Sequence, residues 1–74
     1  MKIYKITWLD ITTVYDWTNK TQALFIPCTE CESVGFLLSE DKKFIRLAHN
    51  INNDEECDIT IIPKGCIIKK QCLS

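Results

Sequence analysis

Glycine, proline and histidine are scarce in this chain, which holds two, two and one of them among 74 residues. Such composition, with 46% hydrophobic and 26% charged residues, excludes a disordered or low-complexity segment and is typical of a globular domain. No apolar run approaches the roughly 20 residues of a membrane-spanning helix, and the N-terminus alternates where a signal peptide would be continuously apolar. We therefore expect one intracellular domain over residues 1–74, with no membrane partner.

Catalytic motifs and a strong charge excess are also absent. The sequence has no glycine-rich phosphate loop, no HExxH and no GxSxG. The single histidine, His49, has no paired acid or nucleophile context, so we interpret it as a surface or loop-anchoring residue. We expect a protein that is not an enzyme and needs no cofactor. Nine Lys or Arg against ten Asp or Glu give a net charge of -1, which disfavours binding of duplex nucleic acid.

The five cysteines are an odd number, and no secretory segment precedes them, so reduced thiols are the better interpretation. Cys28 and Cys31 form a CxxC, which is the spacing of half a zinc site. Cys66 and Cys72 are too widely spaced to complete a zinc knuckle. We assign no metal site and keep zinc binding at Cys28 and Cys31 as the weaker alternative.

Five short segments carry the alternating or β-branched patterns of strands. They cover residues 2–9, 31–39, 44–49, 57–62 and 66–73. Gly35, in the middle of the second segment, predicts a bend or bulge where the sheet curls. Residues 63–65 (Pro-Lys-Gly) cannot continue a ladder and predict a tight turn, for which a single 3₁₀ turn is one form. We predict an all-β fold with at most one short helix: a small, five-stranded, strongly bent barrel whose closure removes unpaired edges.

The connection between the first two strands has the least regular pattern. Residues 18–25 are compatible with about two helical turns, capped by Asp16 or Thr18 and ended by Pro27. So short a helix has little stability of its own, so we expect its neighbourhood to dock on the barrel. The side chains available for docking are Trp17, Leu24 and Phe25.

A bound nucleotide needs aromatic rings to stack on and cations or amides for its phosphates. The irregular connection supplies the rings of Tyr15 and Trp17, although docking of a loop is the competing role for such residues. Asp10 is a candidate acceptor for a base or ribose, with turn formation as its alternative role. The lysines gather near the C-terminus. The candidate ligand-binding residues are Asp10, Tyr15, Trp17, Lys64 and Lys69, with Asp16 and Lys70 beside them.

Two stretches resemble the two-part motif of Sm-like barrels, in which a glycine bends strand two and an Ile-Arg-Gly type turn precedes strand five. They are Val34-Gly35-Phe36-Leu37, followed by Asp41, and Ile62-Pro63-Lys64-Gly65-Cys66-Ile67. The resemblance implies a small barrel and, as an alternative function, an Sm-like RNA-binding module.

A second resemblance spans more of the chain. Its order of residues is similar to that of a group of short, mostly uncharacterised bacteriophage proteins. The shared stretches are Trp8-Leu9-Asp10, Trp17, Cys31-Glu32-Ser33-Val34-Gly35-Phe36-Leu37 and Ile61-Ile62-Pro63-Lys64. This resemblance implies a phage protein in the bacterial host cytoplasm, where small proteins inhibit host systems or sequester nucleotide immune signals. We predict a non-enzymatic anti-defence protein that captures a host nucleotide signal or blocks a host defence protein.

The size of the chain also bears on its assembly. A chain this short buries only roughly 60% of the surface that its unfolded form exposes, so its own core is thin. Terminal strands of a small barrel remain partly unpaired and invite strand addition. We therefore expect a homo-oligomer, either a dimer or a larger closed ring.

Overall fold

Five antiparallel strands form one sheet in the computed structural model, which describes all 74 residues. In chain order they are β1 (Ile3–Asp10), β2 (Thr29–Glu40), β3 (Phe44–Ile51), β4 (Cys57–Pro63) and β5 (Ile67–Cys72). A single helical turn, α1 (Lys20–Ala23), lies between β1 and β2, and a 3₁₀ turn, η1 (Lys64–Cys66), joins β4 to β5. The expected all-β class with one short helix is confirmed, as is the 3₁₀ turn before the last strand.

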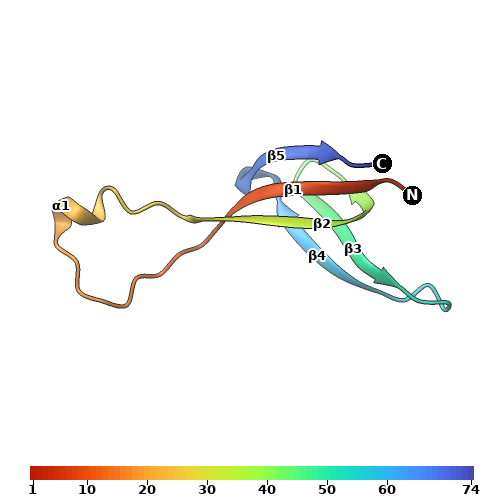
Figure 1. Cartoon of the computed structure of the whole chain (residues 1–74), viewed down its shortest axis with the longest axis horizontal. Coiled ribbons are helices and arrows are strands. Elements are labelled where there is room, and N and C mark those ends of the chain that lie inside the picture. Colours follow the sequence, from red (N-terminus) through yellow and green to blue (C-terminus); the bar gives the residue numbers. More distant parts are fainter.

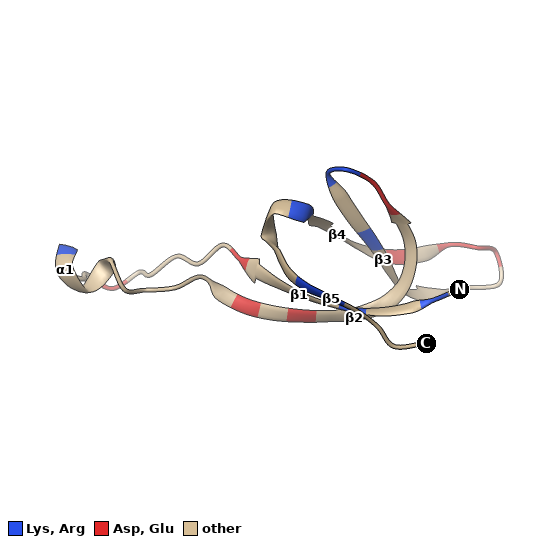
Figure 2. Ribbon diagram, turned by 90° about the horizontal axis from the view of Figure 1, so that it is seen from above, with Lys and Arg blue, Asp and Glu red and all other residues tan.

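The sheet is strongly bent but open. Its strand order is β4-β3-β2-β1-β5, which leaves β4 and β5 at the two edges. Figures 1 and 2 show β2 curving along its length, so that β3 and β4 cross over the layer formed by β1 and β5. β5 pairs with β1 alone, and no ladder joins it to β4. The closed barrel expected from the sequence is therefore not confirmed.

A small apolar core lies inside this bend. It consists of Ile6 from β1, Ile45 and Leu47 from β3, and Ile62 from β4, each of them 0–1% exposed. Alternate residues of a strand point to the same face, which is why Ile45 and Leu47 enter the core together. Four partly buried side chains surround it: Tyr4, Trp8, Leu37 and Ile67. Only six of the 74 residues are buried, so the core is as thin as the chain length predicts.

Gly35 lies where the backbone of β2 comes close to β3. A Cβ at this position would stand 2.6 Å from the backbone oxygen of Ala48 and 3.3 Å from the Cβ of Leu47. The missing side chain therefore permits the close approach of the two strands at the bend. The register of the β2–β3 pair shifts between Leu37 and Ser39, so the bulge lies beyond Gly35 and not at it.

The connection between β1 and β2, residues 11–28, projects from one end of the sheet as an arm (Figure 1). At its base, the backbone N–H of Thr29 donates to Thr12 Oγ1 at 2.7 Å, and the two threonine hydroxyls lie 2.8 Å apart. α1 lies at the far end, where its N-cap Asn19 accepts a hydrogen bond from the backbone N–H of Gln22 at 2.8 Å. The arm gives the molecule its elongated shape, 52 × 21 × 21 Å.

The sequence predictions for the arm are wrong in two respects. The helix has one turn instead of about two, and its cap is Asn19, not Asp16 or Thr18. The expected docking on the sheet does not occur, because Trp17 is 102% exposed and Phe25 80%. The β1–β2 ladder continues to the pair Asp10–Thr29, so the connection begins beyond the core and extends away from it.

The closeness of the Ala48 backbone oxygen to Gly35 predicts how a methyl group at this position changes the free energy of unfolding. In Gly35→Ala the new methyl group meets a backbone oxygen that moves only with its strand, so we expect unfolding to become easier by about 1–3 kcal/mol. Urea unfolding followed by circular dichroism measures this change. Gly65→Ala is the matched control, because a Cβ there has no atom within 4 Å. Equal unfolding midpoints for the two variants would contradict the close approach.

Candidate functional site

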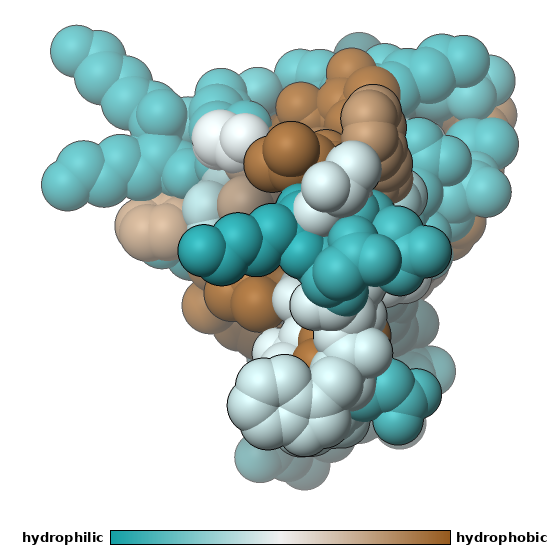
Figure 3. Space-filling view, turned by 90° about the vertical axis from the view of Figure 1, so that its left-hand side faces the viewer, coloured by the Kyte–Doolittle hydropathy of each residue, from teal (hydrophilic) through white to brown (hydrophobic).

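Apart from Asp10, the candidate residues fall on two separate surfaces, the arm and a pocket beside η1. The arm presents an unusual number of large apolar side chains to solvent. The exposed ones are Ile11, Val14, Tyr15, Trp17, Leu24, Phe25 and Ile26. Figure 3 looks onto the end of the molecule that carries the arm and shows exposed apolar side chains among hydrophilic ones. So many exposed large apolar side chains on one short segment are typical of an interaction site.

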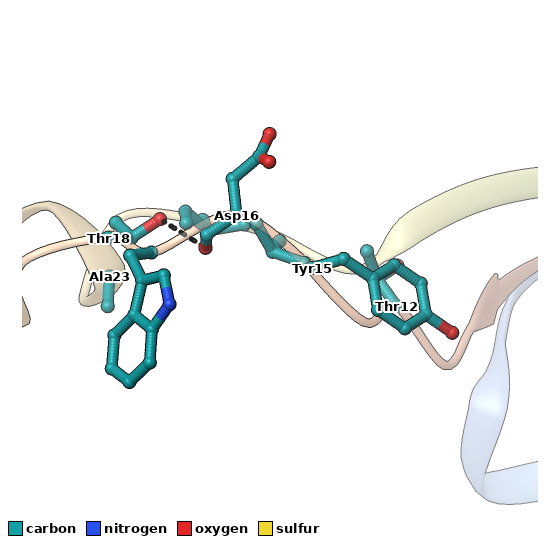
Figure 4. Close-up of a pocket in the computed structure, with 8 residues that line it drawn as sticks. Thr12, Tyr15, Asp16, Thr18 and Ala23 are labelled. Carbon is teal, nitrogen blue, oxygen red and sulfur yellow. Dashed lines mark hydrogen bonds between the residues drawn. The ribbon is translucent and has the colours of Figure 1, made fainter.

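Part of the arm surrounds a depression of about 530 Å³. Its lining residues are Thr12, Val14, Tyr15, Asp16, Trp17, Thr18, Ala23 and Ile26, and all of them are exposed. In Figure 4 the Asp16 carboxylate and the Tyr15 ring point in different directions. The one side-chain hydrogen bond among these residues is long, 3.4 Å from Thr18 Oγ1 to the backbone oxygen of Asp16. A small-molecule site needs convergent polar groups, and this surface has none.

Asp10 belongs to the end of the sheet and not to the depression. Its Oδ1 accepts a hydrogen bond from the backbone N–H of Ile11 at 2.8 Å, directly after β1 ends. This is the turn-forming role that its sequence context offered as the alternative to ligand binding. Nothing in the geometry brings this carboxylate toward the rings of Tyr15 and Trp17.

The second surface, which we call the basic pocket, lies between the end of β2, η1 and β5. It has a volume of about 300 Å³, and three isoleucines are among its lining residues. The residues that line it are Glu40, Ile45, Lys64, Ile67, Ile68, Lys69 and Lys70. The predicted cationic residues Lys64 and Lys69 are thus brought together, with Lys70 beside them.

Glu40 is the one carboxylate in the basic pocket. Lys64 Nζ lies 2.8 Å from its Oε2, and Lys70 Nζ lies 2.8 Å from its Oε1. Hydrogen bonds from Lys64 and Lys70 lower the pKa of Glu40, and Glu40 in turn raises the pKa of Lys70. Lys69 forms no ion pair. The pocket therefore retains a positive balance of three ammonium groups against one carboxylate.

A single chain does not unite the rings with the lysines. Tyr15 and Trp17 lie on the arm, whereas Lys64 and Lys69 lie on the body of the molecule, and the two groups line different hollows. Figure 2 shows the lysines of η1 and β5 set apart from the arm. The site with stacking rings and phosphate-binding cations, as expected from the sequence, is therefore not formed within one chain.

The thiols and the histidine do not form a metal centre. All five cysteines are free, and no group of three or more His, Cys, Asp or Glu side chains converges. Cys28 and Cys31 thus have no third zinc ligand in this chain. His49 Nδ1 lies 2.9 Å from the Val34 carbonyl oxygen, and its Nε2 lies 2.6 Å from Thr60 Oγ1. A carbonyl only accepts, so Nδ1 carries a proton and His49 ties β3 to β2 and β4.

The sequence-based reasoning did not find two features of these surfaces. Nothing in the local sequence around Glu40 predicts its ion pairs, because its partner Lys70 is 30 residues away. The hydrophobicity of Leu24 and Phe25 predicts docking on the sheet, whereas both side chains are exposed and belong to the main surface feature of the arm.

Comparison with protein-family models, curated proteins and solved structures finds no match to this chain. None of its helices has the length and apolar character required to cross a membrane. The arm and the basic pocket themselves are therefore the guide to function.

The ion pairs of Glu40 predict a specific acid sensitivity. Because folding lowers the pKa of Glu40 from its ordinary value of 4.5, its stabilisation is present above that pH and is lost as the pH falls below it. Glu40→Gln removes this contribution, so the variant should lose less stability than wild type between about pH 7 and about pH 3. Urea midpoints at the two pH values measure the difference. The control is Glu30→Gln, since Glu30 forms no ion pair, and parallel losses in wild type and Glu40→Gln would contradict the assignment.

Proposed function

We propose that this chain is a non-enzymatic protein-binding protein that docks its arm on a host defence protein and blocks that protein. The observation that carries the proposal is the exposure of the arm's apolar side chains, among them Trp17 and Phe25. Aromatic residues are enriched in the cores of protein interfaces, and tryptophan and tyrosine are the residues whose truncation most often costs binding energy. A groove on a protein surface can bury such side chains on all sides, whereas a small nucleotide can cover only part of them.

The shape of the arm supports a protein partner as well. The arm extends beyond the sheet, so it can insert into a concave surface of a partner while the sheet stays outside (Figure 1). The pocket-like depression on it is shallow, and its lining residues are exposed and lack convergent polar groups. A small ligand would remain largely hydrated there, whereas a protein groove would cover both sides of the arm.

The biological setting of the proposal comes from the resemblance to short bacteriophage proteins. In this setting the protein acts in the bacterial host cytoplasm during infection, as a homo-oligomer and without a cofactor. For the fold, we propose that the open, bent sheet is a variant of the Sm-like barrel, because a bent β2 and the η1 turn before the last strand occupy the places of its two motifs.

Capture of a host nucleotide signal is the second candidate function. The observation in its favour is the basic pocket, which three lysines and three isoleucines line. The aromatic rings lie elsewhere in the chain, so one copy offers a nucleotide only phosphate contacts. An Sm-like RNA-binding role ranks lower, since Glu40 already neutralises part of the charge of Lys64 and Lys70.

Arm variants test the main proposal in living bacteria. A panel of strains, each with one defence system, is infected after expression of the wild type or of the double variant Trp17→Ala/Phe25→Ala. We expect the wild type to restore phage plating in a strain whose defence protein is the target, and the double variant to fail there. Both side chains are exposed, so the melting temperature should stay within about 2 °C of wild type.

The matched control for the arm variants is Ile61→Ala, which truncates a half-exposed apolar side chain on β4, away from the arm. This control should protect the phage as well as wild type does. A double variant that keeps full activity would contradict the role of the arm.

Titration calorimetry separates the two candidate functions. Against a panel of cyclic and linear nucleotides, protein blocking predicts no binding. Signal capture predicts binding that Trp17→Ala weakens by about 1–3 kcal/mol, if the base stacks on that ring. It also predicts that Lys64→Glu or Lys69→Glu weakens binding and flattens its dependence on salt. Nucleotide binding with these properties would replace the main proposal with the second candidate.

A further inference from the structure

We infer that the arm of one copy docks in the basic pocket of a second copy, and that the second arm docks in the first pocket, which forms a reciprocal dimer. The inference rests on the proposed role of the arm as a docking element. It names the partner that covers the arm while no host protein is bound.

Charge complementarity is the first reason. Asp16 lies between the exposed rings of Tyr15 and Trp17, and its carboxylate makes no ion pair and no side-chain hydrogen bond. In Figure 4 this carboxylate points away from the arm into solvent. The basic pocket carries uncompensated positive charge. Lys69 forms no ion pair, and the single carboxylate of Glu40 neutralises only part of the charge of the two lysines that contact it. The unpaired Asp16 carboxylate therefore complements a pocket with unpaired positive charge.

Apolar complementarity is the second reason. The apolar lining residues of the basic pocket are Ile45, which is buried, Ile67, which is half-buried, and Ile68, which is 53% exposed in the single chain. A ring of the docked arm that packs on Ile68 covers this exposed apolar surface. Trp17, which contacts nothing that shields it from water in one chain, gains the most from this burial.

The position of the pocket makes a reciprocal contact geometrically simple. Ile67, at the start of β5, pairs with Trp8 near the end of β1, so the basic pocket lies close to the base of the arm. The arm itself runs away from the body, with α1 at its far end (Figure 1). Two copies with their arms side by side and antiparallel place each arm over the other copy's pocket. A two-fold axis closes this assembly at a dimer.

In the dimer, a host protein has to displace the basic pocket of the second copy from the arm before it can bind. An arm held by a second copy is unavailable to a defence protein, so blocking requires that the host protein compete with the basic pocket for the arm. Disruption of the pocket should therefore free the arm without damaging it, which separates the dimer contact from the proposed function.

Charge reversal on each side of the contact is the test, with mass measured by sedimentation equilibrium. Wild type should have twice the chain mass of 8.6 kDa, whereas Asp16→Lys alone and Lys69→Glu alone should each be monomeric at the same concentration. An equimolar mixture of the two variants should form the dimer again. In that mixed dimer one contact joins the introduced lysine to the introduced glutamate, and the other contact keeps the original pair.

Two variants control for the change in net charge. Lys2→Glu lies at the N-terminal end, opposite the arm, and Asp54→Lys lies in the β3–β4 loop (Figure 1). Both should remain dimeric. Circular dichroism verifies the fold of every variant. If a charge-reversed variant unfolds, its neutral counterpart, Asp16→Asn or Lys69→Gln, takes its place, and the dimer of that variant should be weaker than the wild-type dimer. A monomeric wild type, a ring larger than a dimer, or a mixture that stays monomeric would overturn the inference.

The phage-plating assay distinguishes failure of the inference from failure of the proposed function. Lys69→Glu leaves the arm intact, so it should still protect the phage. If Lys69→Glu remains dimeric while Trp17→Ala/Phe25→Ala loses protection, the dimer contact is wrong and the function stands. If Lys69→Glu is monomeric while the arm double variant still protects, the dimer contact stands and the function is wrong.

Discussion

The close approach of β2 and β3 at Gly35 is the constraint on which the rest of the fold depends. With no side chain at this position, the backbone of β2 passes against the Ala48 carbonyl, and the sheet bends enough to enclose a core. Without the bend, Leu47 on β3 and Ile6 on β1 would lie on one flat face, open to water. The bend therefore turns a single small sheet into two crossing layers with a buried interior.

The body and the arm are stabilised in different ways. In the body, four ladders, the apolar core and side-chain links such as Trp8 Nε1 to Ser33 Oγ at 3.0 Å hold the strands in register. In the arm, hydrogen bonds join the two sides only near the base, between Thr12 and Thr29. Segments with few buried contacts belong to the low-stability end of a protein, from which binding elements are commonly drawn. The division fits an arm whose exposed side chains serve to bind a partner.

Local patterns predicted the body well and the arm poorly. Strand alternation located all five strands to within a few residues, and the Pro63-Lys64-Gly65 turn was recognised from residues that cannot extend a ladder. Closure was expected because it removes edges, but closure depends on whether β4 and β5 meet, which no local pattern encodes. The exposure of Trp17 and the pairing of Glu40 with Lys70 likewise depend on where distant segments lie. Hydrophobicity alone favoured docking of the arm, and the length of the β1–β2 ladder prevented it.

The elongation produced by the arm changes how the molecule moves in water. Its radius of gyration is 15.7 Å, whereas a compact chain of 74 residues has about 11 Å. Frictional drag rises with such elongation, so diffusion is slower and rotation differs between the long and short axes. On a gel-filtration column the monomer would elute as a heavier sphere, and a calibration against compact standards would assign it the wrong mass. Hydrodynamic size and molecular mass are separate quantities for this protein.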